Sequence, residues 1–187
     1  MPTMGFVADR IFFTKGVGRH KERLTSFELA LRDAGIARYN LVMISSILPP
    51  SCKIIPRAQG DKYLRPGEIV HCVMARADTN EPNRLIAASI GVAIPKNQEH
   101  YGYLSEHHCY GMTEKATGKY AEDLAAQMLA TTLGLPFDAI DYDERKEQFK
   151  LGKEFFTTRE ITQSVEGDKN GNWSTVIAAG VLIGEWR

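Results

Sequence analysis

Two adjacent serines, Ser45 and Ser46, interrupt an apolar run at residues 40–50. The run is rich in β-branched residues and ends at two prolines, which remove backbone donors, so it predicts a short buried strand. Serine is mostly an exposed residue, so a pair of serines in such a strand needs an explanation. One interpretation is structural, with both hydroxyls bonded to nearby carbonyls at a strand end. The other is chemical, because a serine hydroxyl can act as a nucleophile.

The chemical interpretation is self-processing of the chain at the Ser45–Ser46 bond. The Ser46 hydroxyl can attack the preceding carbonyl through a five-membered ring, which replaces the amide with an ester. Removal of the Ser46 α-proton then eliminates the Ser45 carboxylate and leaves a dehydroalanine, which tautomerises and hydrolyses to a pyruvoyl group. That carbonyl can take a substrate amine as a Schiff base and accept electrons from a breaking carbon–carboxylate bond, the role that other enzymes give to pyridoxal phosphate.

Glu106 is a second residue with a possible chemical use. It lies in a predicted strand at residues 100–110, where alternation places it on the same face as Leu104 and opposite Ser105. A charged group on a half-buried strand is commonly paired with a cation. In an apolar pocket, however, a carboxylic acid with a raised pKa can return a proton to the carbanion that decarboxylation leaves.

Glu28 lies in a predicted helix at residues 25–34. Thr25 and Glu28 have the spacing of a capping box, in which each side chain binds a backbone N–H at the other's position. Gly35 supplies the residue that commonly ends a helix. This pattern gives Glu28 a structural role at the start of the helix.

Four segments together resemble pyruvoyl-dependent arginine decarboxylases. They are FELALRDAGI at residues 27–36, the serine-containing run at 40–50, AASIGVAIPK at 87–96 and GYLSE at 102–106. The similarity extends over most of the chain and weakens around residues 136–150. It implies an enzyme that cleaves itself into a small β chain, residues 1–45, and a large α chain, residues 46–187. The implied reaction converts L-arginine to agmatine and carbon dioxide.

The resemblance also implies roles for single residues. Ser46 becomes the covalently bound pyruvoyl group, Ser45 the new C-terminus, and Glu106 the catalytic proton donor. The implied substrate contacts are Ser45, Asn40 and Glu28, with Glu28 at the acidic position that meets the guanidinium, where the family has aspartate. For Asn40 the alternative role is a hydrogen bond at a strand end. The implied assembly is a homotrimer with active sites between neighbouring subunits.

The rest of the sequence predicts the elements that must position these residues. Strands are expected at residues 6–14, 52–55, 68–77, 85–94, 154–165 and 173–183. Gly16 and Gly18 are expected to break the first strand, and Asn170 with Gly171 predicts a type I′ hairpin between the last two. The clearest helix covers residues 113–133. The charged residues 138–150 are expected to form a connection or a short helix.

Many strands with two helices predict an α+β fold. The resemblance implies a helix-covered antiparallel β sandwich with αββα-type layers, which agrees with the need to cover the faces of antiparallel sheets. At 187 residues the chain is expected to be a single domain that buries about 70% of its unfolded surface.

Composition narrows the classes of partner. The formal net charge is zero, so bulk charge predicts no nucleic-acid partner. No apolar run approaches the eighteen or so residues of a membrane span, and the charges at residues 9–10 argue against a secretory signal. Three widely spaced cysteines predict reduced thiols in the cytoplasm. No metal is expected, because neighbouring strand residues such as His107 and His108 project to opposite faces.

Two alternatives to arginine decarboxylation stay open at this point. One is the same chemistry on another amino acid, such as aspartate or histidine, although the acidic Glu28 favours a cationic substrate. The other is an unprocessed, non-catalytic subunit that serves only in assembly, because cleavage depends on local backbone strain that a sequence does not show. Polyamine biosynthesis and acid consumption are both compatible with the reaction.

Overall fold

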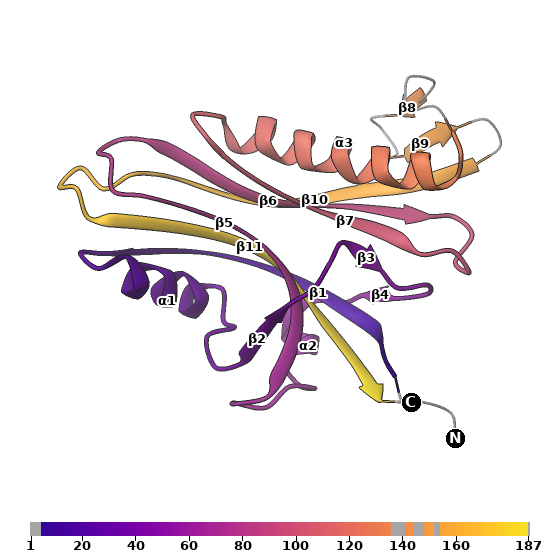
Figure 1. Cartoon of the computed structure of the whole chain (residues 1–187), viewed down its shortest axis with the longest axis horizontal. Coiled ribbons are helices and arrows are strands. Elements are labelled where there is room, and N and C mark those ends of the chain that lie inside the picture. The colour runs from indigo at the N-terminus through magenta and orange to yellow at the C-terminus, as the bar shows by residue number, and fades with distance from the viewer. Residues whose placement is uncertain (1–4, 136–140, 144–147, 152–153, 187) are drawn as a thin grey trace.

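Two β-sheets lie face to face between two covering helices in the computed structural model of the chain (Figure 1). The structure describes residues 5–135, 141–143, 148–151 and 154–186. The strands are β1 Phe6–His20, β2 Asn40–Met43, β3 Ile47–Leu48, β4 Lys53–Ile54, β5 Ile69–Thr79, β6 Leu85–Pro95, β7 Gly102–Tyr110, β8 Asp141–Asp143, β9 Gln148–Leu151, β10 Glu154–Glu166 and β11 Trp173–Trp186. The helices are α1 Arg23–Asp33, α2 Arg57–Gly60 and α3 Glu114–Thr132.

The five-stranded sheet has the order β2-β5-β11-β1-β4, and the six-stranded sheet has the order β3-β7-β6-β10-β9-β8. The long strands pair antiparallel, as β1 does with β11 and β6 does with β10. The short strands β4 and β2 pair parallel, with β1 and β5 respectively. The predicted α+β class is therefore confirmed, but the sheets are mixed rather than purely antiparallel.

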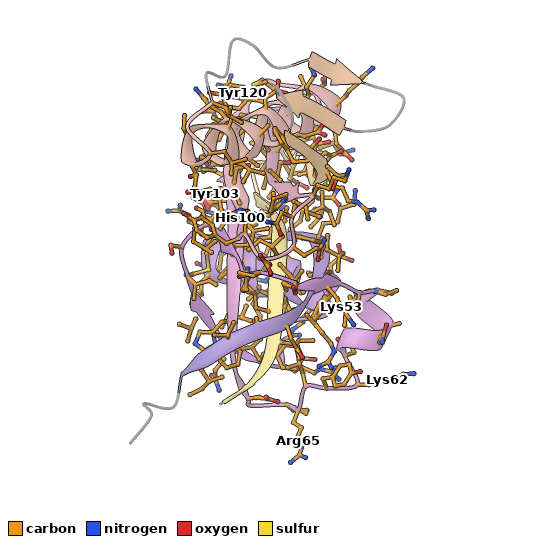
Figure 2. The ribbon with its side chains drawn as sticks, turned by 90° about the vertical axis from the view of Figure 1, so that its right-hand side faces the viewer. Lys53, Lys62, Arg65, His100, Tyr103 and Tyr120 are labelled. Carbon is orange, nitrogen blue, oxygen red and sulfur yellow. The ribbon has the colours of Figure 1, made fainter. Side chains whose placement is uncertain are left out.

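Three apolar clusters fill the spaces between the layers. The first joins Ile11 and Val73 of one sheet to Ile90 and Leu104 of the other. The second packs Ala30 of α1 against Phe12 and Ile177, and the third packs Ala125 of α3 against Ala93 and Phe156. Figure 2 shows the resulting stack from the side, with Tyr120 of α3 at one end and Arg65 at the other. Each sheet therefore buries one face on the other sheet and one on a helix.

The sequence predicted that Gly16 and Gly18 would break the first strand, and this prediction is wrong. Strand β1 runs through both glycines to His20. A Cβ on Gly16 would lie 2.2 Å from the Ala30 carbonyl oxygen, and one on Gly18 would lie 2.0 Å from that of Ser26. Both contacts are with the backbone of α1. The glycines therefore let α1 lie directly on the sheet.

The predicted hairpin at Asn170 and Gly171 is also wrong, because β10 and β11 belong to different sheets. Of the two residues only Gly171 has a positive φ, 77°. The Gly171 N–H donates to the Asp168 carbonyl at 2.9 Å, and the Asn170 N–H donates to the Asp168 carboxylate at 2.8 Å. These bonds make a turn that carries the chain from one sheet to the other.

The long helix is close to its prediction. It spans Glu114–Thr132, and Thr113 caps it by accepting a hydrogen bond from the Ala116 N–H. The charged stretch after it was predicted wrongly where the structure describes it, since β8 and β9 are strands. Residues 138–140 and 144–147 of that stretch lie outside the described residues. No helix within the described ranges is long and apolar enough to cross a membrane.

Candidate active site

The two serines lie where the chain crosses from one sheet to the other. Strand β2 ends on β5 with a hydrogen bond from the Ile44 N–H to the Cys72 carbonyl at 3.0 Å. The Ser46 carbonyl then accepts a hydrogen bond from the Leu104 N–H of β7 at 2.7 Å, and β3 begins in the other sheet. The single buried strand predicted here is therefore two short edge strands, and Ser45 and Ser46 bridge them.

Several apolar side chains beside the serines are exposed, although Leu48 is buried and Ile44 packs against the core. The exposed fractions are 41% for Val42, 51% for Met43 and 38% for Ile47. Edge strands with exposed apolar side chains are a common site of association between chains. The apolar run was predicted to be buried, and the structure buries only part of it, leaving Val42, Met43 and Ile47 exposed.

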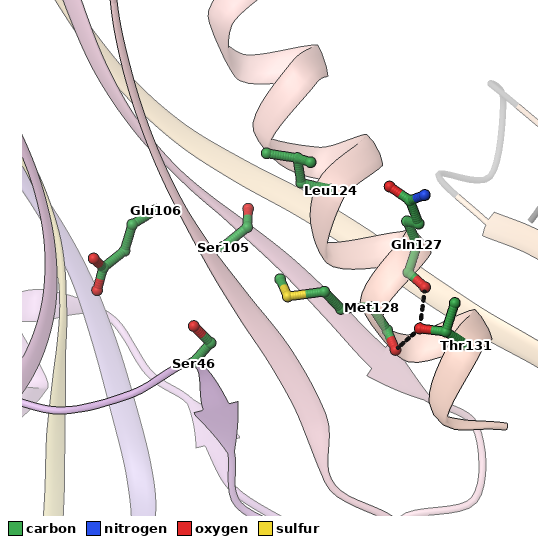
Figure 3. Close-up of a pocket in the computed structure, with 7 residues that line it drawn as sticks. All are labelled: Ser46, Ser105, Glu106, Leu124, Gln127, Met128 and Thr131. Atoms are coloured by element: carbon green, nitrogen blue, oxygen red, sulfur yellow. Dashed lines mark hydrogen bonds between the residues drawn. The ribbon is translucent and has the colours of Figure 1, made fainter.

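Ser46 and Glu106 line one open pocket with a volume of about 570 Å³. Figure 3 shows the Ser46 hydroxyl and the Glu106 carboxylate facing the same space, with the Met128 side chain directed toward them from α3. The other lining residues are Ser105, Leu124, Gln127 and Thr131. Two residues that are far apart in sequence, a nucleophile and an acid, therefore share a pocket at the edge of the two sheets.

The environment of Glu106 favours its protonated form. Partial burial raises the pKa of the Glu106 carboxyl, and a hydrogen bond from the Met74 backbone N–H of β5 lowers it by a smaller amount. Much of the Glu106 side chain is still exposed to solvent. The net direction of the pKa shift is nevertheless upward, because the carboxylate reaches the neighbouring sheet and loses water there.

The opposite face of β7 holds α3 in place, as the predicted alternation requires. The buried Ser105 hydroxyl donates a hydrogen bond to the Ala121 carbonyl of α3. The His107 ring packs on Tyr120 with their centroids 4.5 Å apart. Burial, followed by the charge of His108, lowers the pKa of His107, and its Nε2 has no hydrogen-bond partner among the described residues. Glu106 is left on the face that points between the sheets.

Glu28 does not line this pocket. It lies on α1, which covers the outer face of the five-stranded sheet (Figure 1). The predicted capping box is wrong, because α1 begins at Arg23 with Glu22 at the N-cap position and no side-chain cap. Glu28 instead accepts a hydrogen bond from Arg32 Nε at 3.0 Å, an exposed ion pair one helical turn away.

Asn40 is also outside the described lining of the pocket. Its Nδ2 donates to the Gly67 carbonyl at 2.7 Å, and its backbone N–H donates to the Glu68 carbonyl at 2.8 Å. These bonds hold the start of β2 beside β5. In the chain as described, Asn40 thus has the role of a hydrogen-bonding residue at a strand end.

Sequence reasoning missed the wall of the pocket that α3 provides. Leu124, Gln127, Met128 and Thr131 fall at helical spacing on one face of α3. The signal in the sequence was two polar residues, Gln127 and Thr131, on a face that also carries apolar side chains. A second, apolar pocket of about 480 Å³ lies beside the serines and is lined by Phe6, Val7, Ala8, Ile44, Ile47, Pro49, Pro50, His71, Tyr101 and Leu182.

A serine held at a crossing between two sheets and a carboxyl group with a raised pKa in the same pocket are the features of an enzyme. A family described as pyruvoyl-dependent arginine decarboxylase matches residues 10–187. The chain is 61% identical to a probable pyruvoyl-dependent arginine decarboxylase of Chloroherpeton thalassium, over 96% of this chain and 100% of that protein. It is 57% identical to pyruvoyl-dependent arginine decarboxylase 2 of Methanosarcina mazei, over 93% and 96% of the two chains.

A relative from Nitrosopumilus maritimus, named pyruvoyl-dependent arginine decarboxylase, is 51% identical over 96% of this chain and 99% of its own. The matches cover nearly the whole chain, including the segments that carry Ser46 and Glu106. The chain therefore belongs to the pyruvoyl-dependent arginine decarboxylase family, and the resemblance seen in its sequence is confirmed.

Proposed function

We propose that this chain cleaves itself between Ser45 and Ser46 and that the processed protein converts L-arginine to agmatine and carbon dioxide. The observation that carries the proposal is the shared pocket of Ser46 and Glu106. Membership of the family and the names of the relatives support arginine as the substrate. The unprocessed assembly subunit and the decarboxylase of another amino acid have no such support.

A covalent pyruvoyl group derived from Ser46 fits this site. Ser46 is partly exposed, lines the pocket and is held through its own carbonyl by β7. Such a group supplies a carbonyl that takes the substrate amine and accepts the electron pair released with carbon dioxide, without metal or pyridoxal phosphate. Glu106 then acts as the proton donor, and its raised pKa keeps a larger protonated fraction as the pH increases. Ser45 ends the β chain beside the substrate.

We also propose that the active protein is a homotrimer in which a neighbouring subunit brings Glu28 and Asn40 to the pocket. Neither residue lines the pocket of Ser46 within one copy of the chain, since Glu28 pairs with Arg32 and Asn40 binds the Gly67 carbonyl. Val7, which is 62% exposed, lines the apolar pocket beside the serines together with Ile44 and Ile47 and adds to the exposed apolar surface there. A neighbouring subunit would bury this surface and complete the substrate site.

A cytoplasmic location is part of the proposal. Cys52, Cys72 and Cys109 are free, and the last two are buried. Burial raises the pKa of Cys52 and of Cys72 to about 12, with smaller contributions from Asp9 and Glu106 respectively. Such thiols stay protonated and are suited to a reducing compartment.

The intact mass of the purified protein tests the cleavage. We expect two chains of 45 residues and 187 − 45 = 142 residues, the larger one blocked to sequential N-terminal degradation by its pyruvoyl group. Ser46→Ala removes the attacking oxygen and should give one uncleaved chain of 187 residues that releases no agmatine from arginine. Ser51→Ala, a nearby serine outside the pocket, is the matched control and should cleave normally. A cleaved Ser46→Ala protein would contradict the proposed chemistry.

A further inference from the structure

The two carbonyl groups on either side of the Ser46 side chain are held by different backbone donors. The Ser45 carbonyl accepts from the Ile47 N–H at 3.0 Å, which closes a tight turn centred on Ser46. The Ser46 carbonyl accepts from the Leu104 N–H at 2.7 Å. The second bond is the shorter one, and it comes from a strand of the other sheet.

The donor strand is well fixed at this point. Leu104 is fully buried between the sheets, and β7 continues the same pairing with β3 at Tyr103 and Gly102. Glu106 follows two residues later on the same face. A hydrogen bond to a buried, rigid donor is stronger than one to water and needs no rearrangement when charge develops on the acceptor.

The second step of self-cleavage places charge on this acceptor. After the ester has formed, a carboxylate or hydroxide base takes the Ser46 α-proton. The electrons of the Cα–H bond form a Cα–Cβ double bond, and the Cβ–O bond breaks with its electron pair leaving on the Ser45 carboxylate. While the Cα–H bond breaks, negative charge spreads from Cα onto the adjacent Ser46 carbonyl oxygen, which is the atom that the Leu104 N–H binds.

We infer that the Leu104 backbone N–H is a catalytic donor that stabilises the charge on the Ser46 carbonyl oxygen during this elimination. The inference rests on the proposed self-cleavage. It adds a backbone N–H to the groups that act in cleavage, and substitution of the Leu104 side chain would not remove that N–H. It also separates the two steps, because the Leu104 bond acts on the Ser46 carbonyl, whereas ester formation takes place at the Ser45 carbonyl.

The test replaces the amide between residues 103 and 104 with an ester, by incorporating the α-hydroxy acid that corresponds to leucine at position 104. This change removes the N–H and keeps the side chain. Loss of one such donor slows a reaction by roughly a hundredfold to a thousandfold, so cleavage at Ser45–Ser46 should slow by about that factor. The same change at Val176, in β11 of the other sheet, is the matched control and should leave the cleavage rate within about twofold of the parent rate.

Hydroxylamine distinguishes the two steps, because it cuts the ester intermediate and leaves a chain that begins with an unmodified Ser46. In the Leu104 ester variant we expect hydroxylamine to cut between residues 45 and 46 at least as fast as in the parent, while spontaneous cleavage is slow. Hydroxylamine also cuts the engineered backbone ester between residues 103 and 104, but the fragments from that cut differ in mass from those of the cut at 45–46, so the two cuts are measured separately. Equal loss of hydroxylamine cutting and of spontaneous cleavage would mean a merely structural bond and would overturn the inference.

Two further results separate this inference from the proposed function. A Leu104 ester variant that cleaves at the parent rate overturns the role of Leu104 and leaves self-cleavage intact, whereas a parent chain that never cleaves overturns the proposed function itself. If the ester variant does not fold, the bond is measured in uncleaved Ser46→Ala by nuclear magnetic resonance. We expect a scalar coupling across the hydrogen bond from the Leu104 nitrogen to the carbonyl carbon of residue 46, and absence of that coupling also overturns the inference.

Discussion

Two features of its surroundings shift the pKa of Glu106 in opposite directions. Burial against the second sheet favours the neutral acid, and the Met74 N–H favours the carboxylate, but burial has the larger effect on the pKa. A proton donor needs its acid form at the working pH, so the upward direction suits the proposed role. The Met74 N–H belongs to β5 and the Glu106 carboxyl to β7, which lie in different sheets. The spacing between the sheets therefore controls how strongly the hydrogen bond offsets the effect of burial on the pKa.

Glu106→Gln tests the role of the proton. The amide keeps the size of the side chain but donates no acidic proton, so kcat should fall by roughly 10²–10⁴ while KM changes less. In the parent, kcat should decrease as the pH rises through the raised pKa of Glu106, because the acid form is lost. That decrease should be absent from the pH profile of Glu106→Gln.

A matched control for this substitution is Glu114→Gln. Glu114 lies at the start of α3, outside the pocket, where hydrogen bonds from Ser164 and Lys15 outweigh burial and lower its pKa. We expect unchanged kcat and an unchanged pH profile in this variant. A Glu106→Gln protein that is fully processed and turns over at the parent rate would assign the proton to another group.

The secondary structure elements differ in how far the sequence could predict them. Strands β5, β6 and β7 and helix α3 follow from local periodicity, and each begins within two residues of its prediction. The pairing of β10 with β6 rather than β11 does not follow from local pattern, because a turn after Glu166 looks the same whether it joins strands of one sheet or of two. Sheet membership is a property of the long-range packing.

The two residues proposed to carry the chemistry could be singled out from the sequence, whereas the other residues that line their pocket could not. Ser46 and Glu106 carry local signals, a polar interruption and a charge on a half-buried strand. Met128 and Leu124 look like ordinary apolar residues of a covering helix, and only the gap at the edge of β7 turns them into the wall of a pocket. Neither Glu28 nor Asn40 lines the pocket of Ser46 within the chain, so their proposed substrate contacts stay predictions that require a neighbouring chain.

Gly16→Ala tests the close approach of α1 to the sheet. The added Cβ would meet the Ala30 oxygen at 2.2 Å and the Ala34 nitrogen at 2.7 Å, both backbone atoms that cannot rotate away. Helix α1 must then move outward, which should lower the free energy of unfolding by about 1–3 kcal/mol, as overpacking typically does. Urea unfolding measures the change. Gly5→Ala, where nothing lies within 4 Å, should leave the midpoint unchanged, and an equal midpoint for Gly16→Ala would contradict this account.

At the scale of the whole molecule, a single copy of the chain does not bring together all the residues of the proposed site. The pocket opens at an edge where the two sheets separate, and exposed apolar side chains and a second, apolar pocket lie beside it. The acidic residue expected to meet the guanidinium lies on α1, on the outer face of the five-stranded sheet. Each interface in a closed ring joins two different surfaces of the chain, and the proposed trimer pairs the α1 of one subunit with the pocket of the next.

Complementation between variants tests this arrangement. Glu28→Lys reverses the charge at the expected guanidinium contact, and Ser46→Ala prevents processing, so each protein alone should have little activity. If Glu28 of one subunit serves Ser46 of its neighbour, random mixing of the two variants in one ring leaves about one quarter of the interfaces with both parent residues. Co-expression should therefore restore about a quarter of the parent activity per active site.

The control pairs Ser46→Ala with Glu106→Gln, two residues that line the same pocket of the same subunit. No pocket in that mixture has both parent residues, so activity should not recover, whatever the number of subunits. Recovery in the first mixture and not in the second would require that Glu28 acts across the interface. Failure of the first mixture, with mixed rings demonstrated by affinity tags on each variant, would return Glu28 to its ion pair with Arg32 on the surface of α1.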